Sequence, residues 1–254
     1  MMDAWQLLTL GFLGLVGGAL SGLVGIGGAA VFVPSLVYVA GWGIKEAVGA
    51  SLFVTVFTAL SGTLRGVRSE DRVDWKVFAL LSSVIAPSTL LGVVISRLSP
   101  EVVVQVVFAT LLLVLAYPTT RGNSQGRGST RKIHLAFVLL AGVGVGVLAG
   151  LVGIGGAVLT IPLMVLGFGL RFKVAAATSL AINFLTGVAG ATGYAASGLV
   201  QLGSLPTLIF GAVLGAWLGV GARDRAPEHL IRRGYALLLV FTATRILLDA
   251  ANGP

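Results

Sequence analysis

The sequence predicts an all-α, polytopic helical membrane protein built from two inverted-topology repeats. Three observations support this. Hydrophobic residues make up 56% of the chain and charged residues 10%, whereas soluble domains average about 25% charged residues. The apolar segments are long and are separated by short basic ones. An eight-residue stretch also occurs twice, once in each half.

The charge distribution excludes some classes of function. The net charge is +8, but the Lys and Arg residues lie between apolar runs, as the positive-inside rule expects, so we expect no nucleic-acid partner. No cysteine is present, which excludes disulfides, thiolate metal sites and a thiol nucleophile. Residues 1–6 contain no Lys or Arg, and the apolar run that follows is too long for the core of a cleaved signal peptide.

The repeat is the strongest pattern in the sequence. Residues 22–29 read GLVGIGGA, and residues 150–157 repeat them without a change, 128 positions later. We call these the first and second glycine segments. The register continues through Pro34/Pro162, Lys45/Lys173, Ser51/Ser179, Thr58/Thr186 and Gly62/Gly190. We therefore divide the chain into repeat 1 (1–118), a cytoplasmic linker (119–133) and repeat 2 (134–254).

Each repeat contains four apolar elements. The first repeat has them at 5–41, 47–64, 75–95 and 102–117, and the second at 134–169, 174–195, 202–221 and 230–248. A helix crosses the membrane with about 20 residues. The first element of each repeat is too long, because a straight helix of that length would run over about 50 Å against a hydrocarbon core of about 30 Å. We expect it to break at its glycine segment.

Basic residues indicate how the broken element crosses. If it makes an even number of crossings, 14 of the 17 Lys and Arg residues fall on one side and Lys45, Arg97 and Arg245 on the other. A single crossing gives 9 against 8, which the positive-inside rule disfavours. An even count there makes consecutive repeats enter the membrane from opposite sides, as in many secondary transporters. The count leaves a re-entrant hairpin and two full crossings both open.

The glycine segments are the predicted binding elements. A helix that begins after them, inside the membrane, would point unpaired N–H groups and a partial positive charge at a ligand, and glycine lets an anion approach. The predicted substrate-binding glycines are Gly25, Gly27, Gly28, Gly153, Gly155 and Gly156. The alternative is close helix packing, which we assign to the sets Gly14/Gly18/Gly22, Gly142/Gly146/Gly150 and Gly211/Gly215/Gly219.

Polar side chains at matching positions complete the predicted site. Ser51 and Thr55 of repeat 1 align with Ser179 and Asn183 of repeat 2, and a spacing of four places each pair on one helix face. Such residues also hydrogen-bond helix to helix, so that alternative stays open. We find no pattern for a catalytic residue, metal site or cofactor, and no Asp, Glu, Lys or Arg in the middle of a predicted span.

The doubled segment GLVGIGGA, followed five residues later by Pro34 or Pro162, resembles the TauE/SafE family of membrane anion permeases. The resemblance covers nearly the whole chain. The family signature often has three consecutive glycines, whereas Ala29 and Ala157 follow the pair here. The resemblance implies a multi-pass carrier in the plasma membrane, the inner membrane of a bacterium, that exports sulfite, sulfoacetate or a related anion.

We therefore expect a secondary transporter with a small anionic substrate and membrane lipid as its partners. The main alternative is a passive anion channel, whose reversal potential would ignore a coupling ion. A membrane enzyme would need a nucleophile with a base or a metal cluster, and a scaffold would not need the same helix break twice. The sequence leaves open the substrate, the direction, a coupling ion and a homo-oligomer.

The charge distribution predicts that the linker and residue 99 lie on opposite sides of the membrane. The chain has no native cysteine, so Gln125→Cys and Ser99→Cys each introduce a single thiol. We expect an impermeant maleimide to label the residue 99 thiol in intact cells and the residue 125 thiol only after permeabilisation. Labelling of both from the same side would contradict the inverted repeat.

Overall fold

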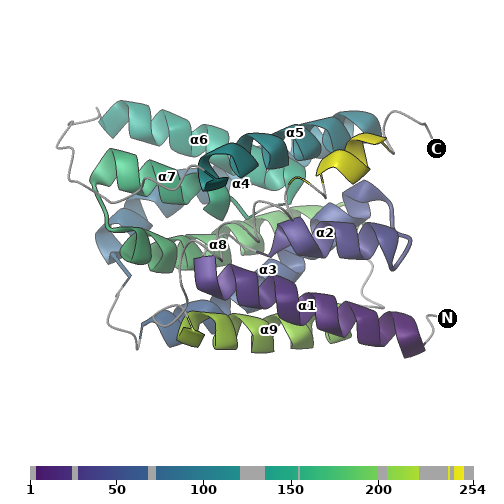
Figure 1. The fold of residues 1–254 in the computed structure, drawn as a ribbon. Coiled ribbons are helices and arrows are strands. Elements are labelled where there is room, and N and C mark those ends of the chain that lie inside the picture. The colour runs from purple at the N-terminus through teal and green to yellow at the C-terminus, as the bar shows by residue number, and fades with distance from the viewer. Residues whose placement is uncertain are drawn as a thin grey trace.

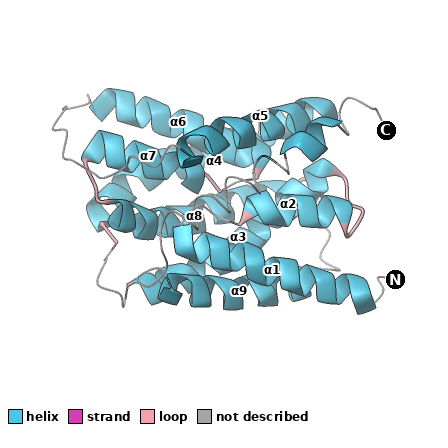
Figure 2. Cartoon of the chain, viewed as in Figure 1, coloured by secondary structure: helices cyan, strands magenta, loops and turns pink. Residues whose placement is uncertain are grey.

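The computed structural model describes residues 4–24, 28–67, 73–120, 135–153, 155–199, 205–222, 240 and 243–248. These residues form a bundle of helices, and none of them is in a strand (Figures 1 and 2). The helices are α1 (Ala4–Val24), α2 (Ala29–Tyr38), α3 (Ile44–Gly66), α4 (Trp75–Leu98), α5 (Glu101–Thr120), α6 (Leu135–Val152), α7 (Ala157–Phe168), α8 (Phe172–Ala195) and α9 (Leu205–Ala222). Residues 240 and 243–248 are also helical, within the predicted last element. Residues 119 and 120 of the predicted linker belong to α5, and its remaining residues, 121–133, lie outside the described residues.

The bundle has the polarity of a membrane protein. In the described part of the chain, five helices are long and apolar enough to cross a membrane, namely α1, α3, α4, α8 and α9. Large apolar side chains such as Phe12, Leu140 and Phe210 face outward, each at least 64% exposed, while Ser and Thr side chains are buried between helices. Lipid accepts an apolar exterior, and interhelical hydrogen bonds accommodate a polar interior. The chain is therefore a multi-pass membrane protein, as predicted.

The first element of each repeat breaks at its glycine segment, as predicted. The break separates a long helix, α1 or α6, from a short one, α2 or α7. α1 has 21 residues and α2 has 10, which correspond to about 31 Å and about 15 Å. α2 returns toward the start of α1, because Gln6 Nε2 donates to the carbonyl oxygen of Val39 at 3.4 Å. The element thus combines one full-length helix with a half-length return.

Basic side chains in the described residues gather at two ends of the bundle. At the end where α1 begins, Lys45 Nζ donates to the carbonyl oxygens of Ser99 and Arg97, and the Arg245 guanidinium lies 5.6 Å from the Tyr38 ring centroid. At the other end, the Arg65 guanidinium lies 5.0 Å from the ring centroid of Trp217, near the end of α9. Lys45 therefore binds the carbonyls at the end of α4, and the three basic residues assigned to the sparse side share one end.

Glycines bring helices of different repeats into backbone contact. α1 of repeat 1 packs on α9 of repeat 2, and α6 of repeat 2 packs on α4 of repeat 1. A Cβ atom added at Gly18 would lie 2.1 Å from the carbonyl oxygen of Ala212, and one added at Gly150 would lie 2.0 Å from that of Thr89. Gly14, Gly22, Gly146, Gly211, Gly215 and Gly219 approach a facing backbone in the same way. The predicted packing role is confirmed for these glycines, while a Cβ at Gly142 would meet only side chains at ordinary distances.

The centre of the bundle is formed by two equivalent helices, α3 and α8. Added Cβ atoms at Gly49 and Gly62, near the start and end of α3, would contact Tyr194 and Leu180, near the end and start of α8. The two helices are therefore antiparallel. In Figure 1, α2 and α7 lie at opposite ends of the view, with α3 and α8 between them.

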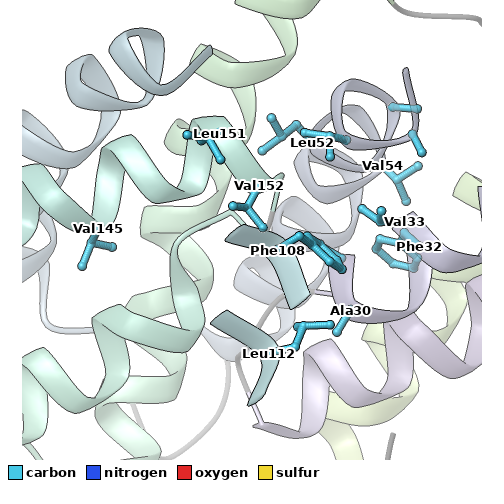
Figure 3. Close-up of a cluster of buried hydrophobic side chains, with 14 of the residues drawn as sticks. Ala30, Phe32, Val33, Leu52, Val54, Phe108, Leu112, Val145, Leu151 and Val152 are labelled. Carbon is cyan, nitrogen blue, oxygen red and sulfur yellow. The ribbon is translucent and has the colours of Figure 1, made fainter. Parts of the chain in front are cut away.

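The short helix α2 is held by an apolar cluster. Phe32 and Val33 of α2 lie beside Val54 of α3 and Phe108 of α5, and all four are fully buried (Figure 3). Seven of the ten residues of α2 are buried. A helix of this length is marginal by itself, so the packing rather than helix propensity keeps α2 formed.

The glycine contacts predict opposite effects for two neighbouring substitutions in α6. A Cβ at Gly146 would lie 2.4 Å from the carbonyl oxygen of Ile85, whereas one at Gly144 would meet nothing within 4 Å. We expect Gly146→Ala to destabilise the protein by about 1–3 kcal/mol, since backbone must move. Gly144→Ala should be neutral or stabilise by up to about 1 kcal/mol through helix propensity. Thermal unfolding in detergent measures both, and equal melting temperatures would contradict close packing of α6 on α4.

Candidate functional site

The second glycine segment ends at mid-depth in the bundle. Gly153, Gly155 and Gly156 have φ values of +78°, +66° and +78°, a conformation that glycine adopts without strain. Gly156 is the N-cap of α7 and no side chain caps it. A Cβ at Gly156 would lie 3.9 Å from the Ile85 side chain, in the middle of α4. The N-terminus of α7 therefore opens inside the membrane-spanning region.

Hydroxyl groups from α3 and α8 bind the carbonyl oxygens of this segment. Ser51 Oγ lies 3.0 Å from the carbonyl oxygen of Gly153 and 2.8 Å from that of Val48. Thr186 Oγ1 donates to the carbonyl oxygen of Gly155 at 2.8 Å. A helix break leaves both donors and acceptors unpaired, and these two side chains satisfy acceptors. In the first turn of α7 the N–H groups of Leu159 and Thr160 donate to the carbonyl oxygen of Gly156 at 3.1 and 3.0 Å. The N–H groups of Ala157 and Val158, which precede them, have no partner within the helix.

Thr55 and Asn183 face Gly155 from opposite helices. A Cβ at Gly155 would lie 3.1 Å from Thr55 Cγ2 and 3.4 Å from Asn183 Oδ1. Both residues occupy the middle of their helices, α3 and α8. The Thr55 hydroxyl donates to the carbonyl oxygen of Ser51 at 2.7 Å. The segment of repeat 2 thus meets polar residues of both repeats.

Asn183 has an unsatisfied side chain. It is 0% exposed, and neither Oδ1 nor Nδ2 has a hydrogen-bond partner among the residues that the structure describes. Thr63 Oγ1 is the only other buried side-chain polar atom there without a partner. A buried, unpaired amide costs about 1–3 kcal/mol, and its position beside the start of α7 places that cost at the glycine break.

The structure brings together six of the ten predicted site residues, which are Ser51, Thr55, Gly153, Gly155, Gly156 and Asn183. Ser179 is buried one turn before Asn183 on α8, and its hydroxyl donates to the carbonyl oxygen of Ala176 at 2.9 Å. Gly28 is the N-cap of α2, again without a side-chain cap, and an added Cβ would collide with the Phe32 ring. Gly25 and Gly27 lie outside the described residues.

The interior around the site carries no formal charge in the part of the chain that the structure describes. Apart from the hydroxyl of Tyr194, every buried polar side chain there belongs to Ser, Thr or Asn. The same residues contain no group of three His, Cys, Asp or Glu side chains that could hold a metal ion. A helix N-terminus with neutral donors and no competing carboxylate is suited to an anion.

Comparison with known proteins identifies the family of this chain. A model of the sulfite exporter TauE/SafE family matches residues 10–246. The chain belongs to the TauE/SafE family. It is 32% identical to the "Probable membrane transporter protein YunE" of Bacillus subtilis, over 93% of this chain and 96% of that protein. A "Probable membrane transporter protein" of Haemophilus influenzae is 28% identical over 97% of this chain and all of its own length. No solved structure matches the chain.

This TauE/SafE protein is therefore a membrane transporter. A third relative, the "Probable membrane transporter protein MJ0441" of Methanocaldococcus jannaschii, is 27% identical over 85% of this chain and 86% of its own length. The family match runs across both glycine segments. These matches give the family and the transport role, and none of the relatives' names gives a substrate.

Tyr194 is a positioning residue that sequence reasoning missed. It is fully buried near the end of α8. The equivalent position in repeat 1, 128 residues earlier, is Gly66, so repeat 1 has no tyrosine there. Tyr194 Oη hydrogen-bonds to Ser96 Oγ at 2.7 Å and donates to the carbonyl oxygen of Gly150 at 3.0 Å. It thus joins α8 to α4 and to the first residue of the second glycine segment. A single tyrosine in an apolar helix gives no sequence signal for this role.

Removing the tyrosine hydroxyl should weaken the bundle. We expect Tyr194→Phe to lower the free energy of unfolding by about 0.6–2 kcal/mol, since a buried interhelical hydrogen-bond donor is lost. Ser96→Ala is the matched control, because it leaves the bond from Tyr194 to Gly150, and should have a smaller effect. Thermal unfolding of the detergent-purified protein measures both. A melting temperature for Tyr194→Phe equal to that of wild type would contradict this role.

Proposed function

We propose that this TauE/SafE protein is a secondary transporter that exports a small anion across the bacterial inner membrane. The substrate class we propose is a sulfur oxyanion or organosulfonate, such as sulfite or sulfoacetate. The observation that carries the proposal is the uncapped start of α7 at mid-depth, surrounded by neutral polar residues. The description of the matching family as a sulfite exporter supports the chemical class.

The site favours anions because its acceptors and donors are unequally satisfied. Ser51 and Thr186 bind carbonyl oxygens of the glycine segment. No side chain caps α7, so the N–H groups of Ala157 and Val158 at its start are left as donors. The partial positive charge of a helix N-terminus adds to them. Several N–H donors suit an anion with several oxygen atoms. With no buried cation among the described residues, binding should be moderate, and release on the other side is then easier.

We propose that the two repeats have inverted topology and move against each other around this site. The antiparallel packing of the equivalent helices α3 and α8 supports this relation. So does the exchange of partners, in which the first helix of each repeat packs on the other repeat. Ser51, Thr55 and Asn183 are buried, so substrate access requires the repeats to shift. The first glycine segment would supply the equivalent contacts from the other side, through Gly25, Gly27 and Gly28.

The proposal predicts saturable stabilisation by sulfur oxyanions. A ligand that binds only the folded protein raises its melting temperature by mass action. Sulfite, thiosulfate, sulfate or a sulfonate should raise the melting temperature of the purified protein, and chloride at equal ionic strength should not. The same anion should be transported into or out of proteoliposomes. If every sulfur oxyanion fails while cations or neutral solutes stabilise the protein, the anion proposal is wrong.

Glycine variants test the location of the site in the same assays. Gly155→Val and Gly27→Val should each abolish transport while folded protein remains in the membrane, and Gly155 in particular has φ +66°, which valine does not tolerate. Ser51→Ala should weaken binding by about 1 kcal/mol. Gly144→Val is the control, because a Cβ there meets open space. Normal transport by both glycine-segment variants would place the site elsewhere.

A further inference from the structure

The two repeats place chemically different side chains at equivalent positions of the site. Thr55 of repeat 1 corresponds to Asn183 of repeat 2, 128 residues later. The Thr55 hydroxyl has a partner in its own helix, the carbonyl oxygen of Ser51. The Asn183 amide has none in the described part of the chain, although it is fully buried. The binding site is therefore asymmetric, and the unsatisfied groups belong to Asn183.

An amide side chain needs two kinds of partner. Nδ2 donates hydrogen bonds and Oδ1 accepts them, and both atoms of Asn183 lack a partner. A fully deprotonated oxyanion has acceptors alone, so it would satisfy Nδ2 and leave Oδ1 facing a negative oxygen. A protonated oxyanion carries a hydroxyl beside a charged oxygen. That pair of groups can bind the amide at both atoms.

The position of the amide ties it to the anion site. Asn183 Oδ1 lies 3.4 Å from where a Cβ of Gly155 would stand, and Gly156 next to it is the uncapped N-cap of α7. An anion at the start of α7 would therefore lie beside Asn183. Its charged oxygens would face the N–H groups of α7 and Asn183 Nδ2, and its hydroxyl would donate to Oδ1.

We propose that Asn183 selects the protonated, monoanionic form of the oxyanion, a species with a hydroxyl next to a charged oxygen. This inference rests on the proposed function and specifies the substrate class of the same site. The monoanion also loses less hydration energy than a dianion on entering an interior without a buried cation. One proton then crosses the membrane together with the anion, bound to the substrate and not to a side chain.

The described helices around Asn183 offer no other carrier for that proton near the site. α7, which holds Gly155 and Gly156 at its start, has no titratable side chain. On α8 itself and on α3 and α4, which pack against it, the charged side chains stand at the helix ends, as Lys45, Glu46, Arg65, Lys76, Arg97 and Lys173. Tyr194 lies 11 residues beyond Asn183 and bonds to Gly150 and Ser96. Protonation of the substrate, rather than of the protein, therefore sets the pH dependence of binding.

Two probes of equal charge and similar size test the selection. At mildly acidic pH methylphosphonate is a monoanion with one hydroxyl, and methanesulfonate is a monoanion with none. We expect the full-length protein in detergent to bind methylphosphonate about tenfold more tightly, as measured by calorimetry or thermal shift, since one hydrogen bond, from the probe's hydroxyl to Asn183 Oδ1, distinguishes them. Raising the pH should weaken methylphosphonate binding as the probe loses its proton, and should leave methanesulfonate binding unchanged.

Variants at Asn183 separate selection from a structural role. Asn183→Leu has nearly the same volume and removes both unsatisfied atoms, and Asn183→Thr reproduces the residue of the other repeat. In both variants the two probes should bind equally, and the melting temperature without ligand should be equal to or higher than that of wild type. A lower melting temperature for both variants would show that the amide has a structural partner, and would overturn the proposal.

The outcomes distinguish this inference from the proposed function. The wild-type protein would bind both probes equally and at every pH if only water satisfied the amide. In that case the proposed selection of the protonated monoanion by Asn183 is wrong, while the proposal of an anion site is unaffected. If neither these probes nor any sulfur oxyanion binds, the proposed function itself fails. The inference is supported only if the preference exists in wild type and disappears in both Asn183 variants.

Discussion

A helix that breaks inside a membrane leaves backbone polar groups that lipid cannot solvate, and the rest of this structure depends on how they are satisfied. At the second glycine segment the carbonyl oxygens of Gly153 and Gly155 are bound by hydroxyls of Ser51 and Thr186. No side chain caps the start of α7. Side chains therefore bind carbonyl oxygens of the break, whereas no side chain caps the first N–H groups of α7, and this difference is the basis of the proposed anion site.

The contacts between these side chains and the glycine segment need helices held at fixed distances. Glycines in α1, α4, α6 and α9 allow backbone contact between helices of different repeats, and a single Cβ atom would collide with a facing carbonyl in many places. Between these pairs lie α3 and α8, which carry the polar side chains of the site. Interior packing of this kind is not continuously deformable. Because these pairs join helices of different repeats, any movement of the repeats against each other must also rearrange these contacts.

The repeated architecture supports chemistry that is not repeated. Thr55 and Asn183 occupy equivalent positions, yet one is satisfied within its helix and the other has no partner among the described residues. Tyr194 has glycine at its equivalent position, and it binds the first residue of one glycine segment. In the proposed mechanism the repeated scaffold alternates between two sides, while a side chain of one repeat selects the substrate.

The sequence by itself determined the helical membrane class, the helix breaks at the two glycine segments and the packing glycines, because length, hydropathy and a 128-residue repeat are local or periodic properties. It also identified Ser51, Thr55 and Asn183 as polar residues on buried faces. Only the tertiary structure decided that Ser51 and Thr55 meet the glycine segment of the other repeat, that Tyr194 joins three helices, and that the Asn183 amide has no partner in the described residues. Those facts depend on how the repeats pack against each other, and contacts between residues over a hundred positions apart leave no periodic signal in one sequence.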